Sequence, residues 1–364
     1  MRKENTAAAQ GKTNNRLIGI DLLKAFSCLA ILAWHVFANG GFNFSGIAAA
    51  KVIPSWDHLV YLFMILSGFG ISNGYHKRFM QKEISLDYFY IRRYQRILPY
   101  FSILILLNIL ADLSINSIMQ GIIEISLVFG FLPNNMLDVV GVAWTLGIIF
   151  VFYITYPFFV FLTADKKRAW LSLLCSVLIQ SMCQIYFMTE IFVVKDYVPR
   201  HSFLYCVPFF LAGCIIFLYK DKITQVIGNK KPLVLGLCLA LTVLYYLLPQ
   251  KTGKFSILEL KLLLLYALWA VFSLTIQRIP KIEWLINYIS SISMEIYLSH
   301  MLCFRVLEKT GVLHLFGKGF RSYVIDVVLT MIAVLIFIPI IQLLIALAGR
   351  ILAKINLRNR NITF

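Results

Sequence analysis

The sequence predicts an all-α fold: a polytopic integral membrane helix bundle with about ten transmembrane helices and a short re-entrant or interfacial helix near residues 117–132. The chain is 60% hydrophobic and 14% charged, against about 25% charged in an ordinary soluble domain. Its mean hydropathy is +0.80, and apolar stretches of about 20 residues, long enough to cross a bilayer as helices, recur along it. These observations exclude a soluble enzyme, a disordered chain and a disulfide-stapled secreted module.

Each predicted helix follows from the length of an apolar stretch. The predicted spans cover residues 17–39, 57–75, 97–113, 142–163, 169–190, 201–219, 232–249, 257–277, 284–304 and 322–349. Between the third and fourth spans, the apolar run from Gly121 to Leu132 is too short to cross, and Pro133 ends it. A re-entrant or interfacial helix on the outer face accounts for this run.

The basic residues sort to one side of this bundle. Of the 34 Lys and Arg, 24 lie on one predicted side. They precede the first span, lie within it at Lys24, or follow the second, fourth, sixth, eighth and tenth spans. Because an excess of Lys and Arg marks the cytoplasmic side, both termini are predicted to be cytoplasmic. The same sorting explains most of the net charge of +17, so nucleic acid is not predicted as a partner.

One membrane domain is predicted at residues 17–349, because no connection is long enough to hold a second domain. A cytoplasmic tail at 1–16 precedes it and a basic cytoplasmic tail at 350–364 follows it. The first span carries ionisable residues and a long apolar run, which favours an uncleaved helix over a signal peptide.

The first span holds Asp21, Lys24 and His35, and ionisable groups inside a membrane are costly enough to suggest function. Lys24 and His35 are 11 residues apart, about 20° from a whole number of turns, so they share a face roughly 16 Å apart along the axis. Asp21 lies close to the same stripe, within salt-bridge range of Lys24. The alternative roles are snorkelling of Lys24 to the interface and a packing hydrogen bond for His35.

A second imidazole, His300, lies at a similar depth in the ninth predicted span. Glu295 is deeper in that span, where an unpaired carboxylate would be expensive. The two residues are about 140° apart around the helix, so Glu295 is expected to pair with a group on another helix. A functional role and a packing role both remain open for Glu295.

Arg92, Arg93 and Arg96 stand at the start of the third span. Their spacing lets guanidinium groups meet on one side of a helix and bind phosphate with bidentate geometry. The alternative is a role in topology and in binding anionic lipid.

Taken together, these segments resemble the acyltransferase-3 family of bacterial integral membrane acyltransferases. Four patterns carry the resemblance, in order along essentially the whole chain: Lys24 and His35 with ten residues between them, Leu62 to Phe69 ending in Leu-Ser-Gly-Phe, Arg92 to Pro99 as Arg-Arg-x-x-Arg-Ile-x-Pro, and Tyr297 to His300 as Tyr-Leu-x-His. Each pattern is weak alone, and their order makes the resemblance specific.

The chain departs from the family pattern in the fourth span. Where many members have Trp-Ser-Leu-x-x-Glu, this sequence has Trp144-Thr-Leu-Gly-Ile-Ile149, without the carboxylate. The role of that glutamate beside the first-helix histidine therefore does not carry over. Asp57, Glu124, Asp138 and Glu295 remain open as carboxylates that could orient His35.

The resemblance implies transfer of an acetyl or other short acyl group from cytoplasmic acyl-CoA, such as acetyl-CoA, to a hydroxyl of a cell-surface or lipid-linked glycan. His35, Lys24, His300 and Glu295 are the candidate catalytic residues, and Arg92, Arg93 and Arg96 are the candidates for binding CoA phosphates. No metal is expected. The implied location is the bacterial plasma membrane, and a separate extracytoplasmic transferase is a candidate partner because many relatives carry such a domain.

Two other functions fit ten helices with buried charge: a transporter or polysaccharide export component, and a structural or sensor protein in which the histidines are merely packed. No pair of Gly- or Pro-broken helices is evident at matching positions in two halves, which disfavours a transporter.

Overall fold

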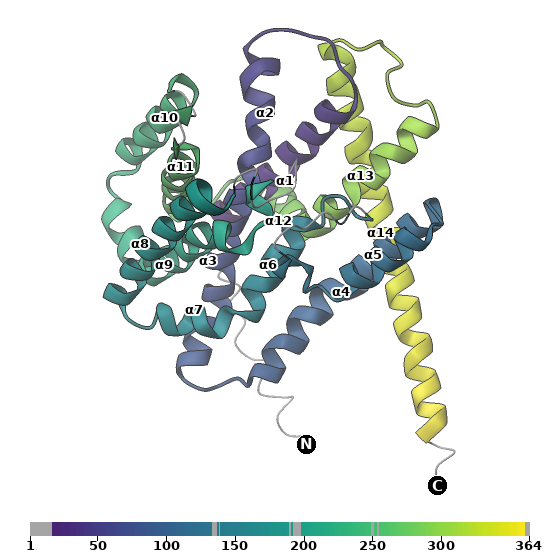
Figure 1. The fold of residues 1–364 in the computed structure, drawn as a ribbon, viewed down its shortest axis with the longest axis horizontal. Helices are drawn as coiled ribbons and strands as arrows, with labels where there is room; N and C mark the ends of the chain where they lie inside the picture. Colours follow the sequence, from purple (N-terminus) through teal and green to yellow (C-terminus); the bar gives the residue numbers. More distant parts are fainter. Residues whose placement is uncertain are drawn as a thin grey trace.

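The computed structural model describes residues 17–132, 137, 139–188, 191, 198–248, 251–252 and 255–360, with side chains left out at 251–256 and 352–360. The described part is almost entirely helical (Figure 1). The predicted tail at 1–16, residues 361–364 and Asp138 lie outside the described residues.

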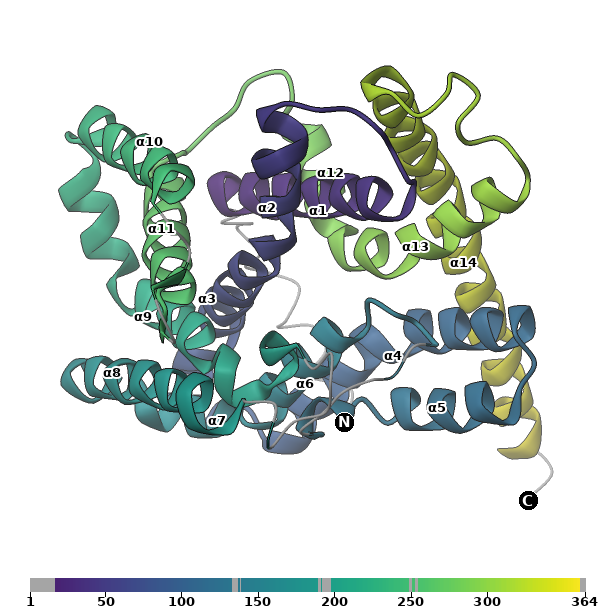
Figure 2. The same ribbon diagram turned by 45° about the horizontal axis from the view of Figure 1, so that its top comes forward.

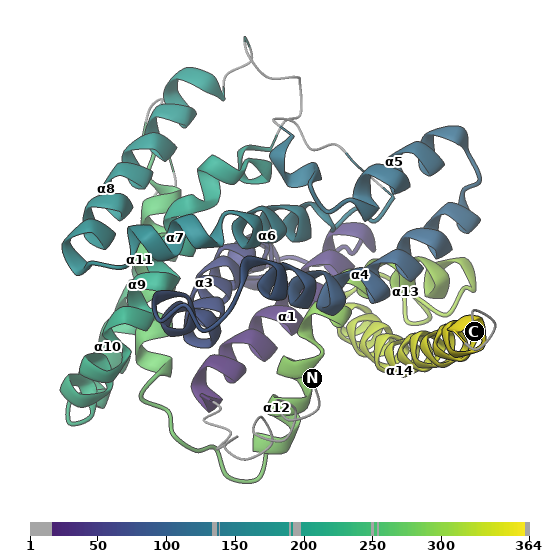
Figure 3. The ribbon, with the colours of Figure 1, turned by 90° about the horizontal axis from the view of Figure 1, so that it is seen from below.

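Three helices form the centre of the bundle: α1 (Ile18–Asn39), α3 (Leu59–Met80) and α9 (Phe203–Ile227). Seen from below, α1 and α3 lie amid the other helices, with α8 and α14 at the periphery (Figure 3). Glycines let α3 and α9 approach closely, since a Cβ on Gly68 would lie 2.2 Å from the carbonyl oxygen of Phe210. A Cβ on Gly213 would lie 2.0 Å from that of Ile65, so larger residues at either position would force the helices apart.

The first half of the chain supplies the helices around one side of the centre. They are η2 (Ala48–Val52), α2 (Ile53–Ser55) and η3 (Trp56–His58) leading into α3, then α4 (Leu86–Ala111), α5 (Ile115–Ile125), η4 (Phe129–Phe131), α6 (Trp144–Ile154), α7 (Tyr156–Leu162), α8 (Lys166–Met182) and η5 (Cys183–Phe187). The axes of α6 and α7 differ by 59°. Pro157 follows this break at the start of α7, where its missing N–H costs no helical hydrogen bond.

The second half closes the bundle around α1. Its elements are η6 (Pro199–His201) before α9, then α10 (Lys231–Leu247), a two-residue antiparallel pair β1 (Lys251–Thr252) and β2 (Phe255–Ser256), α11 (Leu258–Ser273), α12 (Glu283–Ser291), α13 (Ser293–Lys309) and α14 (Phe320–Arg360). Both α12 and α13 pack against α1. Residues from the two ends of the sequence therefore meet across this contact.

Length and composition identify fewer spans than the sequence predicts. Among the described residues, six helical segments are long and apolar enough to cross a membrane, or seven if α6 and α7 form one bent span. The remaining predicted spans fall on α10, which has 17 residues, on α11, which has 16, and on α12 and α13, which break at Ile292. A multi-pass membrane protein is thus established, and the number ten stays a prediction.

The predicted short helix near 117–132 corresponds to α5 and η4, and α5 runs back alongside α4 (Figure 2). On α5, Gly121 and Glu124 are buried, whereas Ile115 and Ile122 are among the exposed apolar residues. That α5 is re-entrant or interfacial remains a prediction.

Two of the basic segments lie at one end of the bundle. The connection from α3 to α4 and the C-terminal end of α14 are both at the bottom of Figure 1, and the connection from α13 to α14 is at the top. We call the end with the α3–α4 connection the arginine end, since Arg92, Arg93 and Arg96 lie near the start of α4.

Candidate functional site

A cavity of about 350 Å³ opens between α1, α3, α4, α6, α12 and α13. Lys24, Arg93 and Arg96 are the cationic residues of its lining. Apolar side chains and hydroxyls cover the remaining wall. The cavity thus combines three cationic side chains with a mostly apolar lining, which suits a ligand with an anionic head and an uncharged arm.

Aromatic residues fix the guanidinium group of Arg93. Its Nη2 donates to the phenol oxygen of Tyr75 at 2.6 Å, and the group lies 4.8 Å from the Tyr75 ring centre and 5.6 Å from that of Tyr153. Its Nε is buried and has no hydrogen-bond partner among the described residues. A guanidinium that is held in place and lines the cavity is well placed to bind a phosphate oxygen through its remaining N–H groups.

Arg96 connects the same cavity to the buried carboxylate predicted to need a partner. Its Nη1 lies 3.1 Å from Oε1 of Glu295, and its Nη2 donates to the carbonyl oxygen of Ser291 at 3.1 Å. Oε2 of Glu295 is buried and accepts no hydrogen bond from the described residues. The partner expected on another helix is therefore Arg96 on α4, and Glu295 holds that guanidinium in the lining of the cavity.

Two further predicted residues near this end, Arg92 and Asp21, do not line the cavity. Arg92 is exposed, donates to the phenol oxygen of Tyr88 at 3.4 Å and does not line the cavity. Asp21 is buried one turn from Lys24 and accepts a 2.5 Å hydrogen bond from the Ser290 hydroxyl. The structure thus brings together Lys24, Arg93 and Arg96 and leaves Arg92 outside.

Farther along the bundle, His35 and His300 face each other across the contact of α1 with α13. Their ring centres are 4.8 Å apart, with the planes inclined by 59°. His300 is 1% exposed, and His35 is half-buried. The two imidazoles predicted at similar depth therefore form one pair.

Hydrogen bonds to the backbone assign the same tautomer to both rings. Nδ1 of His35 donates to the carbonyl oxygen of Ile31 at 2.9 Å, and Nδ1 of His300 donates to that of Tyr297 at 2.7 Å. The lone pair of each neutral ring is consequently on Nε2. Nε2 of His300 is buried without a hydrogen-bond partner among the described residues. Each ring is therefore oriented to accept a proton at Nε2.

Two hydroxyl groups stand where the cavity ends. Thr145 and Tyr297 line the cavity, whereas neither imidazole does. The Thr145 hydroxyl and the Tyr297 phenol are hydrogen-bonded at 2.7 Å, and the Tyr297 ring lies 5.9 Å from that of His300. The shared face of Lys24 and His35 is therefore not one open channel, because Tyr297 separates the cavity from the histidine pair.

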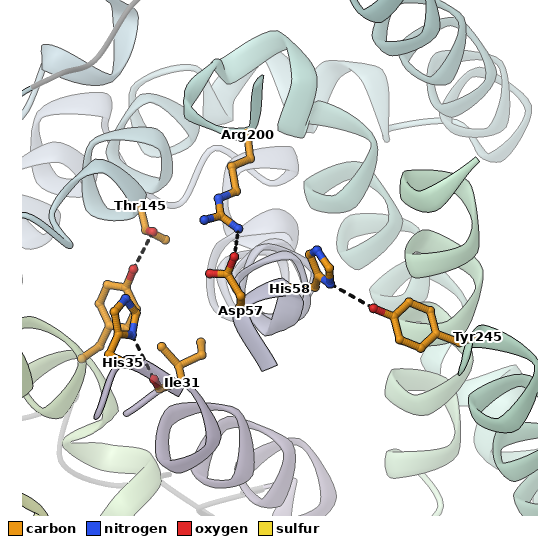
Figure 4. A network of polar contacts seen from close by, with 8 residues as sticks. Ile31, His35, Asp57, His58, Thr145, Arg200 and Tyr245 are labelled. Carbon is orange, nitrogen blue, oxygen red and sulfur yellow. Dashed lines mark hydrogen bonds and ion pairs between the residues drawn. The ribbon is translucent and has the colours of Figure 1, made fainter. Parts of the chain in front are cut away.

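Asp57 and Arg200, which lie near His35 in Figure 4, belong to a charged and aromatic cluster. Arg200 forms an ion pair with Asp57, and its guanidinium group lies 5.3 Å from the ring centre of Trp144, which stacks on His201 at 4.2 Å. Figure 4 shows the Asp57–Arg200 pair and the Thr145 hydroxyl on the same side of the His35 ring.

The four carboxylates that remained open as partners of His35 are now placed, apart from Asp138. Asp57 binds Arg200, Glu295 binds Arg96, and Glu124 accepts from the backbone N–H of Val140 at 3.2 Å. Within the described ranges no carboxylate hydrogen-bonds to His35, whose Nδ1 donates to a backbone carbonyl. Ile149, which stands where the motif resemblance leads one to expect a glutamate, lines the cavity.

Sequence reasoning missed the residues that connect the two halves of the site. Tyr297 and Thr145 were only parts of motifs, and the Asp57–Arg200 pair joins residues far apart in the chain. A signal was present for the latter, since Asp57 is the first residue of one predicted span, Arg200 directly precedes another, and such charges need partners. In the part of the chain that the structure describes, no three His, Cys, Asp or Glu side chains cluster in a way that could hold a metal ion.

An apolar helix bundle with a cationic cavity near a pair of imidazole bases defines a class: multi-pass membrane proteins equipped for group transfer. The family model described as an acyltransferase domain, Acyl_transf_3, matches residues 17–346. The chain belongs to this acyltransferase-3 family, which confirms the resemblance of its motifs. No curated protein matches the chain, and no solved structure does.

Proposed function

We propose that this membrane acyltransferase moves an acetyl or other short acyl group from acyl-CoA to a hydroxyl of a cell-surface or lipid-linked glycan. The observation that carries the proposal is the cation-lined cavity ending one side chain away from the His35–His300 pair. The cavity would bind the anionic donor, and the neighbouring histidine pair would provide a base for the acceptor.

The donor would enter from the arginine end. Lys24, Arg93 and Arg96 would hold its phosphates, and the uncharged pantetheine arm would extend along the apolar wall of the cavity. Lys24 and His35 are separated by roughly 16 Å along α1, a distance that an extended pantetheine arm can cover. The thioester would then lie close to Tyr297 and Thr145, which line the cavity.

The acceptor hydroxyl would meet the thioester at His35. Nε2 of His35 takes the hydroxyl proton as the oxygen forms a bond to the thioester carbonyl carbon. The carbon–sulfur bond then breaks, and the proton on the imidazole passes to the departing CoA sulfur, which leaves as the thiol. His300, in contact with His35, would stabilise the protonated ring through its free Nε2 lone pair.

The hydrogen bond between Thr145 and Tyr297 has to open for the thioester to reach His35. Tyr297→Phe removes this bond, which is worth about 0.5–1.5 kcal/mol, so the cavity should open more often. We expect hydrolysis of acetyl-CoA without acceptor to rise by about threefold to tenfold. Release of free CoA by purified protein measures it. Tyr245→Phe, which removes a phenol bonded to His58 outside the cavity, is the matched control and should leave the rate unchanged.

The proposed setting is the bacterial plasma membrane, with ten spans and both termini in the cytoplasm. Two observations support this orientation. The basic residues sort to one predicted side, and the α3–α4 connection and the C-terminal end of α14 lie at the same end of the bundle. Acetyl-CoA would then reach the arginine end from the cytoplasm, and a separate extracytoplasmic transferase could receive the acyl group on the other side.

Mass analysis of surface glycans from cells with and without the gene distinguishes the enzyme from a transporter. The proposal predicts that loss of the gene removes an O-acyl group, such as the 42 Da of acetyl, while the polymer is still exported. An unmodified polymer retained inside the cell would support export instead. Unchanged glycans with normal export would refute both assignments.

A further inference from the structure

A second cavity lies near the end of the bundle opposite the arginine end. It has a volume of about 290 Å³ and is formed where the C-terminal ends of α4 and α13 meet α5. Its lining residues are Asn108, Ala111, Asp112, Asn116, Ser117, Gln120, Val139, Leu302, Arg305, Val306 and Lys309. It shares no residue with the cationic cavity of the proposed active site. We call it the amide pocket, for its two asparagines and one glutamine.

Two cations on one face of α13 line the amide pocket. Arg305 and Lys309 are four residues apart, one helical turn, so both side chains can reach the same ligand. Among the described residues neither forms an ion pair, although Glu308 lies on the same turn of α13. Two cations in a concave surface, neither of them held in an ion pair among the described residues, are suited to an anionic group such as a phosphate.

The other polar residues of the lining are suited to a ligand that also carries hydroxyl groups. Asp112 accepts from the Ser117 hydroxyl at 3.2 Å and has further oxygen lone pairs to accept from a ligand. A carboxylate in the lining disfavours a ligand that is only anionic, whereas amides and a carboxylate together are suited to a polyol. The volume is at the lower end of the range for ligand pockets, which limits the bound part to about one sugar or glycerol unit.

We propose that the amide pocket binds a phosphate ester of a polyol, the chemistry shared by sugar phosphates and by phospholipid headgroups. Arg305 and Lys309 hold the phosphate, and Asp112 with the amide side chains holds the hydroxyl groups. Exposed apolar residues on the adjoining turns of α4, Leu106 and Leu110, indicate that the pocket opens at the level of the membrane. A lipid can therefore present the ester.

Binding to the full-length protein tests this proposal without any acyl transfer, so it stands or fails separately from the proposed function. The purified protein in phosphatidylcholine nanodiscs is titrated with phosphatidylglycerol, and bound lipid is counted by native mass spectrometry. Arg305→Gln/Lys309→Gln should weaken retention of phosphatidylglycerol at least tenfold. The matched control Lys318→Gln/Arg321→Gln removes the same charge from exposed residues after α13, outside the pocket, and should retain wild-type binding.

Glycerol 3-phosphate and glucose 1-phosphate distinguish the two sources of the ligand. If either displaces the lipid from wild-type protein at millimolar concentration, a free phosphorylated polyol is sufficient for the pocket. If neither does, the ligand is the lipid-borne ester. Equal loss of binding in the pocket variant and in the control variant would overturn the proposal, because the effect would then be one of net charge. Unchanged binding in both variants would overturn it equally.

Discussion

Replacing His35 with alanine should lower the rate of acyl transfer by about 10²- to 10⁴-fold, the range expected when a general base is removed. His35 makes its hydrogen bond to a backbone carbonyl of its own helix, so its loss should leave the bundle folded. The measurement is the initial rate of CoA release by purified protein with a glycan acceptor at saturating acetyl-CoA.

Two further variants make the His35 result specific. His58→Ala removes another half-buried imidazole, one that contacts Tyr245 and not His300, and should retain the wild-type rate. His300→Ala should cause a smaller loss than His35→Ala, because His300 acts through its neighbour. A rate in His35→Ala within tenfold of wild type would contradict the role of His35 as the base.

Replacing Arg93 with alanine should raise the KM for acetyl-CoA by about 10- to 100-fold and leave kcat almost unchanged. A hydrogen bond to a charged group contributes about 1.5–3 kcal/mol, and Arg93 would contact the donor equally in the ground state and the transition state, which places the effect in KM. Steady-state kinetics over a wide range of acetyl-CoA concentrations measure both constants.

Arg92→Ala is the informative comparison for Arg93, because the sequence places both arginines in one cluster. In the structure Arg92 is exposed against Tyr88 and lies outside the cavity, so its KM should stay within about twofold of wild type, as is usual for exposed charges. A large KM effect for Arg92 with none for Arg93 would mean that the donor binds elsewhere on the arginine end.

The sequence was sufficient for the class of fold and for the family, because both depend on features local in the chain. Apolar runs identify helices, and motifs such as Lys24 to His35 are read along one helix. Helix geometry also located Glu295 away from the face of His300 and so predicted a partner on another helix. Which helix that was could not be predicted, and the structure supplies Arg96 on α4.

Contacts between distant segments set the limit of sequence reasoning. The pairing of His35 with His300 and the bond of Thr145 to Tyr297 depend on how α1, α6 and α13 pack, which no single helical pattern encodes. The same limit explains why three arginines were predicted to act together. Only the packed structure distinguishes Arg93 and Arg96, which face α3 and α13, from Arg92, which faces outward.

The central claim is that an acyl donor entering at the arginine end is used by His35. Sealed vesicles of defined orientation test it most directly, with orientation read from protease access to a tag at the C-terminus. Radioactive acetyl-CoA is added outside, and labelled acceptor is counted for wild-type and His35→Ala protein. We predict labelling only by wild-type protein, and only when the tagged, arginine end faces outward. Equal labelling in the opposite orientation, or undiminished labelling by the His35→Ala variant, would contradict the account.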